Sequence, residues 1–219
     1  MEAVVFDMDG VLFDTERLCM ESWREIAAEK GIENIEPAVL GCIGLNRNDT
    51  IQFFKDHYGE DFDFEDFRIG YSERMEQKLK EGGLPVKPGV RELLRYLEEK
   101  KIPMAVASST RRERVLGHLE ESGIQNYFQV VIGGDQVLHS KPEPDIYLLA
   151  CKSLSVSPEK SFAIEDSING IRSAFRAGMQ VIMVPDMIAP TPEAIEKTAV
   201  IKDSLTEVLN WFQESKAFA

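Results

Sequence analysis

The sequence is poor in cysteine. Its 219 residues include three, Cys19, Cys42 and Cys151. These are odd in number, far apart and in no C-x-x-C arrangement, so neither a disulfide framework nor a zinc site has support. We therefore expect a reducing compartment, the cytoplasm.

Net positive charge and long hydrophobic runs are also lacking. With 25 Lys and Arg against 38 Asp and Glu, the formal charge is -13. This balance disfavours partners such as nucleic acid and anionic membranes, which bind positive surfaces. No apolar run approaches the roughly 18 residues of a membrane span, and Met1–Ala3 lacks the basic start of a signal peptide. An acidic protein can still bind a phosphorylated substrate if a metal ion and a few Lys or Arg side chains reverse the potential locally.

The composition that remains is that of a folded protein, with 43% hydrophobic and 29% charged residues. The length favours one α/β core with a sizeable insertion. The apolar run Ala3–Phe6 predicts a buried strand that ends at an Asp-Gly turn. Residues 15–82 look entirely helical, with helices predicted at about 15–30, 48–58 and 64–80.

From Pro88 onward, helices alternate with short apolar strands, which is typical of a doubly wound parallel sheet. Helices are predicted at 90–100, 112–121, 146–154, 168–177 and 205–212, with another starting near Pro192, and strands at 104–107, 130–132, 162–164, 181–184 and 200–201. The predicted fold class is thus α/β, with residues 1–14 and 83–219 forming the core and residues 15–82 an inserted helical domain.

Two carboxylates follow the first strand, where ligands of open α/β sheets bind. Alternation along an extended chain places Asp7 and Asp9 on the same side, about 6 to 7 Å apart by Cα rise. One carboxylate could attack while the other moves protons, or both could hold a metal. The alternative is an Asp-Gly turn whose acids are merely solvated.

Other strand ends carry polar residues as well: Ser108, Ser109 and Thr110, then Lys141 before Pro142, then Glu165 and Asp166. Each group alone could be a helix cap or a surface residue. Together they converge on one edge of the sheet. There Asp7, Asp9 and Asp166 could supply oxygen ligands to Mg²⁺, while Lys141 and Ser108 could bind the oxygens of a phosphoryl group. A carboxylate can itself be the nucleophile and form an aspartyl phosphate.

These four segments, D-x-D-G-V-L at 7–12, the Ser108 segment, Lys141-Pro142 and Glu165-Asp166-Ser167, resemble the four motifs of the haloacid dehalogenase superfamily. Their order, with a helical insertion after the first motif, resembles the branch that contains β-phosphoglucomutase and sugar-phosphate phosphatases. The resemblance implies a Rossmann-like core with an inserted helical cap domain.

The resemblance also implies roles for the strand-end residues. Asp7 would attack phosphorus, and Asp9 would protonate the leaving oxygen and then activate water. Magnesium would be held by the Asp7 carboxylate, the Asp9 main-chain carbonyl and Asp166, with Glu165 close by.

Substrate contacts are implied in the same way. Ser108, Ser109 and Lys141 would bind the phosphoryl group. The segment 44–47 is similar to a substrate-specificity loop, in which Arg47 would grip a second anionic group or the sugar. Thr15 would lie at the hinge where closure of the cap expels water.

The predicted function is a magnesium-dependent phosphatase, monomeric, that acts on a small phosphorylated metabolite, a sugar phosphate. One alternative is a hexose-phosphate mutase of the β-phosphoglucomutase kind. The positions of a mutase cap histidine and cap lysine are Cys19 and Glu76 here, which weakens the grip on a second phosphate and favours hydrolysis. A non-catalytic phospho-acceptor module is a third hypothesis.

Overall fold

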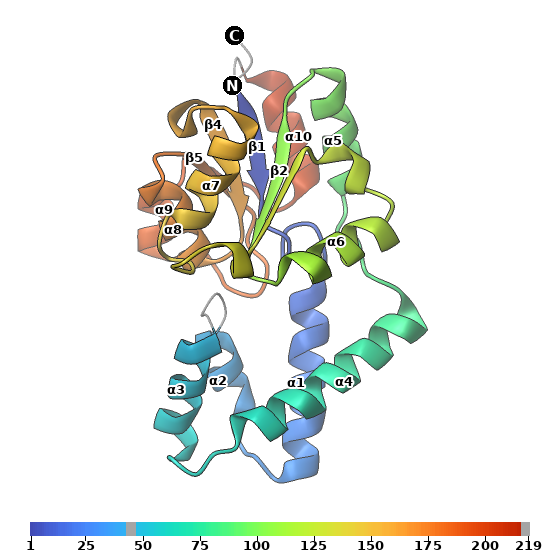
Figure 1. The fold of residues 1–219 in the computed structure, drawn as a ribbon, viewed down its shortest axis with the longest axis vertical. Helices are drawn as coiled ribbons and strands as arrows, with labels where there is room; N and C mark the ends of the chain where they lie inside the picture. Colours follow the sequence, from blue (N-terminus) through green and yellow to red (C-terminus); the bar gives the residue numbers. More distant parts are fainter. Residues whose placement is uncertain (43–46, 216–219) are drawn as a thin grey trace.

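The centre of the molecule is a six-stranded sheet with the order β3-β2-β1-β4-β5-β6 (Figure 1). All neighbouring strands pair in parallel, which confirms the predicted fold class. The computed structural model describes residues 1–42 and 47–215, apart from the side chains of residues 47–49. The strands are β1 (Ala3–Phe6), β2 (Met104–Ser108), β3 (Val130–Gly133), β4 (Ser161–Glu165), β5 (Gln180–Met183) and β6 (Val200–Ile201).

Helices cover both faces of this sheet. They are α5 (Val90–Glu99), α6 (Arg112–Glu121), α7 (Asp145–Leu154), α8 (Ile168–Arg176), α9 (Pro192–Lys197) and α10 (Leu205–Glu214). Side chains of β1 alternate between the two layers: Val4 and Phe6 pack in the cluster with α5, α6 and α10, and Val5 packs in the cluster with α7, α8 and α9. A strand buried on both faces has no polar alternation, which is why its sequence is continuously apolar.

Four helices lie apart from the sheet, below it in Figure 1. They are α1 (Thr15–Lys30), α2 (Ile35–Cys42), α3 (Arg47–Tyr58) and α4 (Phe64–Gly82). They share a hydrophobic cluster of their own, in which Trp23, Phe54 and Phe67 pack edge to face or tilted. None of the described helices combines the length and apolar character needed to cross a bilayer.

The two chain segments that join this helical part to the sheet are paired with each other. Phe13 and Val86 form an antiparallel bridge. The Asp14 amide donates to the Pro85 carbonyl at 2.9 Å, and the Lys87 amide donates to the Leu12 carbonyl at 3.0 Å. The separate cores and the paired connection support the division at residues 14 and 83, which stays a prediction.

Candidate active site

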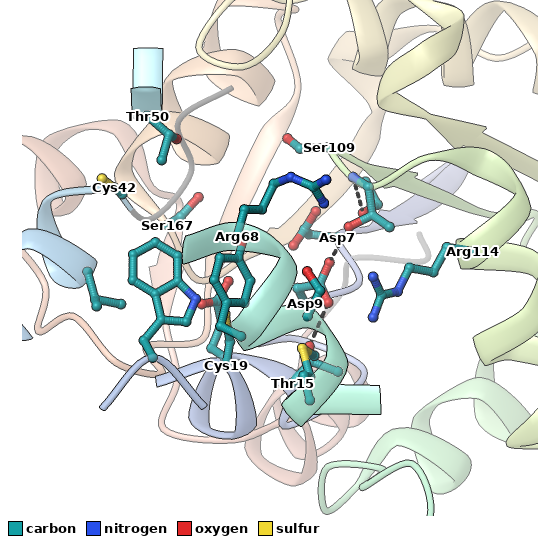
Figure 2. Close-up of a pocket in the computed structure, with 18 of the residues that line it drawn as sticks. Asp7, Asp9, Thr15, Cys19, Cys42, Thr50, Arg68, Ser109, Arg114 and Ser167 are labelled. Carbon is teal, nitrogen blue, oxygen red and sulfur yellow. Dashed lines mark hydrogen bonds between the residues drawn. The ribbon is translucent and has the colours of Figure 1, made fainter. Parts of the chain in front are cut away.

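A cavity of about 420 Å³ lies between the carboxyl edge of the sheet and the helices α1, α2 and α4 (Figure 2). Its volume is in the range of small-molecule sites. Asp7, Ser108, Lys141 and Asp166 line the end of the cavity that the sheet forms. The parallel strands therefore bring the predicted strand-end residues to one place.

Asp7 follows β1 directly and is buried. Its amide donates to the Ile164 carbonyl at 3.0 Å, so the ladder between β1 and β4 extends by one bond beyond Phe6. Burial, together with the negative charges of Glu165 and Asp9, raises the pKa of Asp7 to about 7, although Lys141 opposes that rise.

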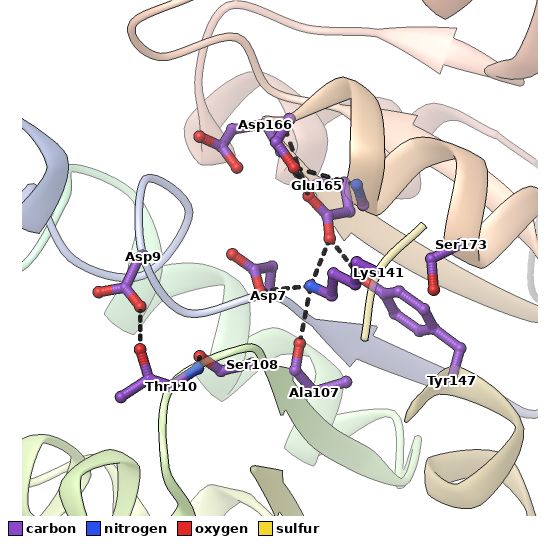
Figure 3. Close-up of polar contacts among 12 residues, drawn as sticks. Asp7, Asp9, Ala107, Ser108, Thr110, Lys141, Tyr147, Glu165, Asp166 and Ser173 are labelled. Atoms are coloured by element: carbon purple, nitrogen blue, oxygen red, sulfur yellow. Dashed lines mark hydrogen bonds and ion pairs between the residues drawn. The ribbon is translucent and has the colours of Figure 1, made fainter. Parts of the chain in front are cut away.

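Lys141 is the positive centre of the site (Figure 3). Its buried ammonium group donates to Asp7 Oδ1 at 2.6 Å, to Glu165 Oε1 at 2.6 Å and to the Ala107 carbonyl at 3.0 Å. All three donors of the ammonium group thus have acceptors, each from a different strand end. Burial by itself lowers the pKa of Lys141, but the carboxylates of Asp7 and Glu165 raise it above its usual value, so the side chain stays charged.

Glu165 is fully buried and accepts hydrogen bonds on both oxygens. The Tyr147 hydroxyl donates to Oε1 at 2.6 Å, and the Tyr147 ring lies 5.1 Å from the Lys141 nitrogen. The amides of Asp166 and Ser167 and the Ser167 hydroxyl donate to Oε2 at 3.2 to 3.3 Å. Because both oxygens of Glu165 accept hydrogen bonds from these partners, the carboxylate is fixed in one orientation. It can therefore orient the ammonium group of Lys141. Sequence reasoning missed Tyr147, since nothing local marks a helical tyrosine as a partner of a distant glutamate.

Carboxylate oxygens of Asp7, Glu165 and Asp166 all lie within 4.8 Å of one another, as expected for a metal site. Burial and the charges of Glu165 and Asp7 raise the pKa of Asp166 well above its usual value. A bound cation would relieve this repulsion, and an all-oxygen donor set suits Mg²⁺. Asp7 and Asp166 fit direct coordination best, because Glu165 is already occupied by hydrogen-bond donors.

Asp9 lines the same cavity as Asp7, as expected, but among the described residues its carboxylate is not part of the cluster of Asp7, Glu165 and Asp166. Its Oδ1 accepts from the Thr15 hydroxyl at 2.6 Å and its Oδ2 from the Thr110 hydroxyl at 2.9 Å. The two threonines fix the carboxylate beside the cavity, and Thr15 is the first residue of α1. Metal coordination by the Asp9 main-chain carbonyl stays a prediction.

Among the remaining predicted substrate residues, two serines line the cavity and the others have no described side chain. Ser108 is buried at the cavity, where its hydroxyl accepts from the Thr110 amide at 3.1 Å. Ser109 is exposed and also lines the cavity. Residues 44–46 lie outside the described residues, and Arg47 begins α3 without a described side chain, so its role stays a prediction.

Helix α4 presents one face to the cavity. Phe64, Arg68, Tyr71 and Met75 line the cavity, whereas Glu76 is exposed and is not among the lining residues. Glu76, which counting placed at the position of a mutase cap lysine, therefore does not line the cavity. The spacing 64-68-71-75 is one helical stripe, and a cation within an apolar stripe is the signal that could have identified Arg68.

Two more lining residues come from α1. Burial raises the pKa of the Cys19 thiol, which is therefore neutral at physiological pH. Burial and the charges of Asp9 and Asp7 raise the pKa of Glu16 to about 8. The acids around the cavity therefore repel one another strongly when no cation is bound.

Comparison with known proteins agrees with this geometry. The family model of the haloacid dehalogenase-like hydrolases matches residues 4–184. The chain belongs to this family.

Three similar proteins illustrate the relationship. A phosphorylated carbohydrates phosphatase of Thermotoga maritima is 35% identical over 215 residues, which is 98% of this chain and 99% of the relative. The crystal structure of CbbY from Rhodobacter sphaeroides in complex with phosphate has a TM-score of 0.78 and 30% identity, and the match covers 95% of this chain and 96% of that one. The crystal structure of β-phosphoglucomutase from Clostridium difficile has a TM-score of 0.80 at 23% identity, covering 98% and 96%. The last similarity is one of fold.

Proposed function

We propose that this protein is a magnesium-dependent phosphatase that hydrolyses a small phosphorylated metabolite, a sugar phosphate. The observation that carries the proposal is the position of Asp7, held by Lys141 and adjacent to Asp166 at the floor of a cavity of about 420 Å³. A carboxylate placed between a cation and a metal-binding acid is suited to attack phosphorus. The carbohydrate phosphatase from Thermotoga maritima supports the substrate class.

The reaction has two steps. A carboxylate oxygen of Asp7 attacks phosphorus, the ester bond breaks, and Asp9 gives its proton to the leaving oxygen. Asp9 then takes a proton from the water that attacks the aspartyl phosphate, which releases phosphate and restores Asp7. Thr15 and Thr110 hold the Asp9 carboxylate in one orientation during both transfers.

Charge development on the phosphoryl oxygens needs positive partners. Lys141 supplies one charge at the floor of the cavity, and the Ser108 hydroxyl adds a donor. A magnesium ion bound by Asp7 and Asp166 would neutralise further negative charge on substrate and protein. Closure of the helical part over this end of the cavity would exclude water and so strengthen each of these interactions.

One residue of the helical part, Cys19, favours hydrolysis over mutase chemistry. A mutase must hold its bisphosphorylated intermediate, and Cys19 offers a neutral thiol where a mutase would use a histidine. Phosphorus NMR of β-glucose 1-phosphate with a bisphosphate primer separates the two reactions: glucose 6-phosphate without free phosphate would favour the mutase.

We also propose that the protein is a cytoplasmic monomer. Gel filtration tests the oligomeric state.

The decisive experiment measures phosphate release from a panel of sugar phosphates with and without Mg²⁺. We expect release that depends on Mg²⁺ and is abolished by Asp7→Asn and by Asp9→Asn. Asp203→Asn is the matched control, because Asp203 is exposed and is not among the residues that line the cavity. Absence of release from every compound would contradict the proposal, and a long-lived phosphorylated Asp7 without turnover would favour the phospho-acceptor module.

A further inference from the structure

Two arginines reach the cavity from opposite sides (Figure 2). Arg68 belongs to α4 of the helical part and Arg114 to α6 beside the sheet, and both line the cavity whose floor contains Asp7. In the close-up both guanidinium groups are turned toward the end of the cavity where Asp7 and Asp9 lie. The two cations thus face one space from two parts of the chain.

Both guanidinium groups retain donors for a ligand. Arg68 donates from Nε to Glu65 at 3.1 Å, and its side chain is 35% exposed. This contact leaves the terminal N–H groups of the fork free to bind a ligand. Arg114 is exposed and forms no hydrogen bond or ion pair with the side chains described at 1–42 and 50–215.

The phenol of Tyr71 lies within the influence of both arginines. Burial raises the pKa of Tyr71, and the positive charges of Arg68 and Arg114 both oppose that rise. Tyr71 itself lines the cavity from α4. Arg68 and Arg114, from two different parts of the chain, thus line the same cavity as Tyr71.

The floor of the cavity has a cation and a candidate metal site of its own without these arginines. Lys141 is paired with Asp7 and Glu165, and the acids Asp7 and Asp166 are suited to a divalent cation. The transferring phosphoryl group is served by that set. Arg68 and Arg114 add two positive charges that a substrate with a neutral sugar tail would leave unused.

We propose that the substrate carries a second anionic group, a phosphate or a carboxylate, which binds between Arg68 and Arg114. This inference rests on the proposed phosphatase function, which it extends to a substrate class. A planar guanidinium binds such groups through two parallel N–H donors, which makes arginine more selective here than lysine. A substrate with two anionic groups, called doubly anionic below, would also bridge α4 and α6. Its second anionic group would therefore favour the closed arrangement of cap and sheet.

The test compares matched substrates that differ in one anionic group. The pairs are fructose 1,6-bisphosphate against fructose 6-phosphate, and 6-phosphogluconate against sorbitol 6-phosphate. The native protein should show a larger kcat/KM for the doubly anionic member of at least one pair. Arg68→Gln and Arg114→Gln should each lower that preference by about tenfold to hundredfold, the size expected for a charged hydrogen-bonded contact. The pair that responds identifies the second group as phosphate or carboxylate.

Two variants control for the loss of a positive charge alone. Arg111→Gln removes a charge at the start of α6, and Arg74→Gln removes one on α4, where Arg74 pairs with Glu25 and Glu29 away from the cavity. Both should keep the native preference. If Arg68→Gln lowered kcat/KM equally for both members of a pair, Arg68 would bind the transferring phosphoryl group and the proposal would be overturned. A native protein with the same kcat/KM for both members of each pair would also overturn it.

Calorimetric binding of the same compounds to Asp7→Asn makes the test independent of turnover. Tighter binding of the doubly anionic compounds, lost in the two arginine variants, would support the second-anion site even if no phosphate were released. That result would contradict the proposed phosphatase function and would still support the second-anion site. Equal binding of both members of each pair would overturn the site.

Discussion

One hydroxyl group, that of Tyr147, completes the hydrogen bonds around the buried Glu165 carboxylate. We expect Tyr147→Phe to lower the free energy of unfolding by about 1.5–3 kcal/mol, the usual size for a hydrogen bond to a charged group. The loss arises because a buried oxygen of Glu165 loses one of its hydrogen-bond donors in a site where water cannot replace it. Urea denaturation followed by circular dichroism measures the change.

The matched control for this prediction is Tyr127→Phe. Tyr127 packs at the edge of the core, and its hydroxyl has no hydrogen bond to the described residues. Its replacement should change the free energy of unfolding by less than about 0.5 kcal/mol. If both variants unfold at the same urea concentration, the Tyr147 hydroxyl does not stabilise the network.

The residues that sequence reasoning identified and those it missed differ in what places them. Asp7, Lys141 and Asp166 follow strands or a strand-end loop, and parallel strands bring such positions to one edge whatever the details of packing. Arg68 and Tyr147 lie on helices, where their roles depend on the rotation and docking of the whole helix. Periodicity shows which residues share a face but does not show what that face meets.

At the scale of elements, α8 packs unusually close to the end of β4. A Cβ added at Gly170 would lie 1.8 Å from Glu165 Oε1, within a helix of ordinary backbone. Gly170→Ala should therefore displace Glu165, destabilise the fold by about 1–3 kcal/mol and reduce phosphatase activity by disturbing Lys141. Thermal unfolding and phosphate release measure the two effects.

Gly117→Ala is the matched control on another helix. Gly117 lies in α6, and a Cβ there meets nothing within 4 Å. Because alanine is the better helix former, this variant should be unchanged or more stable by up to about 1 kcal/mol. Stability in Gly170→Ala equal to that of the native protein would show that α8 can shift away from Glu165.

Helix α2 shows where prediction of elements fails. It spans Ile35–Cys42 and is absent from the sequence prediction, since Pro37 lies in its first turn and Gly41 near its end. Both residues are typical of breaks, but proline fits the first turn of a helix and Gly41 packs against Phe53. Such short helices are specified by packing, here against α1 and α3, and less by their own pattern.

At the scale of the whole molecule, the acidic site couples stability to pH. Burial raises the pKa of Asp7 to about 7 and that of Glu16 to about 8, and it raises the pKa of Asp166 as well. Between about pH 4 and pH 8 the folded, metal-free protein therefore binds more protons than the unfolded chain, so its stability falls as pH rises. The change from 3.8 to about 7 at Asp7 corresponds to at most about 4 kcal/mol.

In EDTA, the melting temperature should therefore decrease from about pH 5 to about pH 8. Each 1 kcal/mol corresponds to about 2–4 °C for a domain of this size. Millimolar Mg²⁺ should remove most of the decrease. The bound cation stabilises the ionised carboxylates, whose mutual repulsion destabilises the metal-free protein at high pH. Asp7→Asn, which cannot ionise at this position, should show a shallower decrease in EDTA than the native protein. A melting temperature that stayed constant or rose over this range in EDTA would mean that the buried acids do not repel one another as their arrangement indicates, and it would remove the electrostatic reason for a cation at this edge of the sheet.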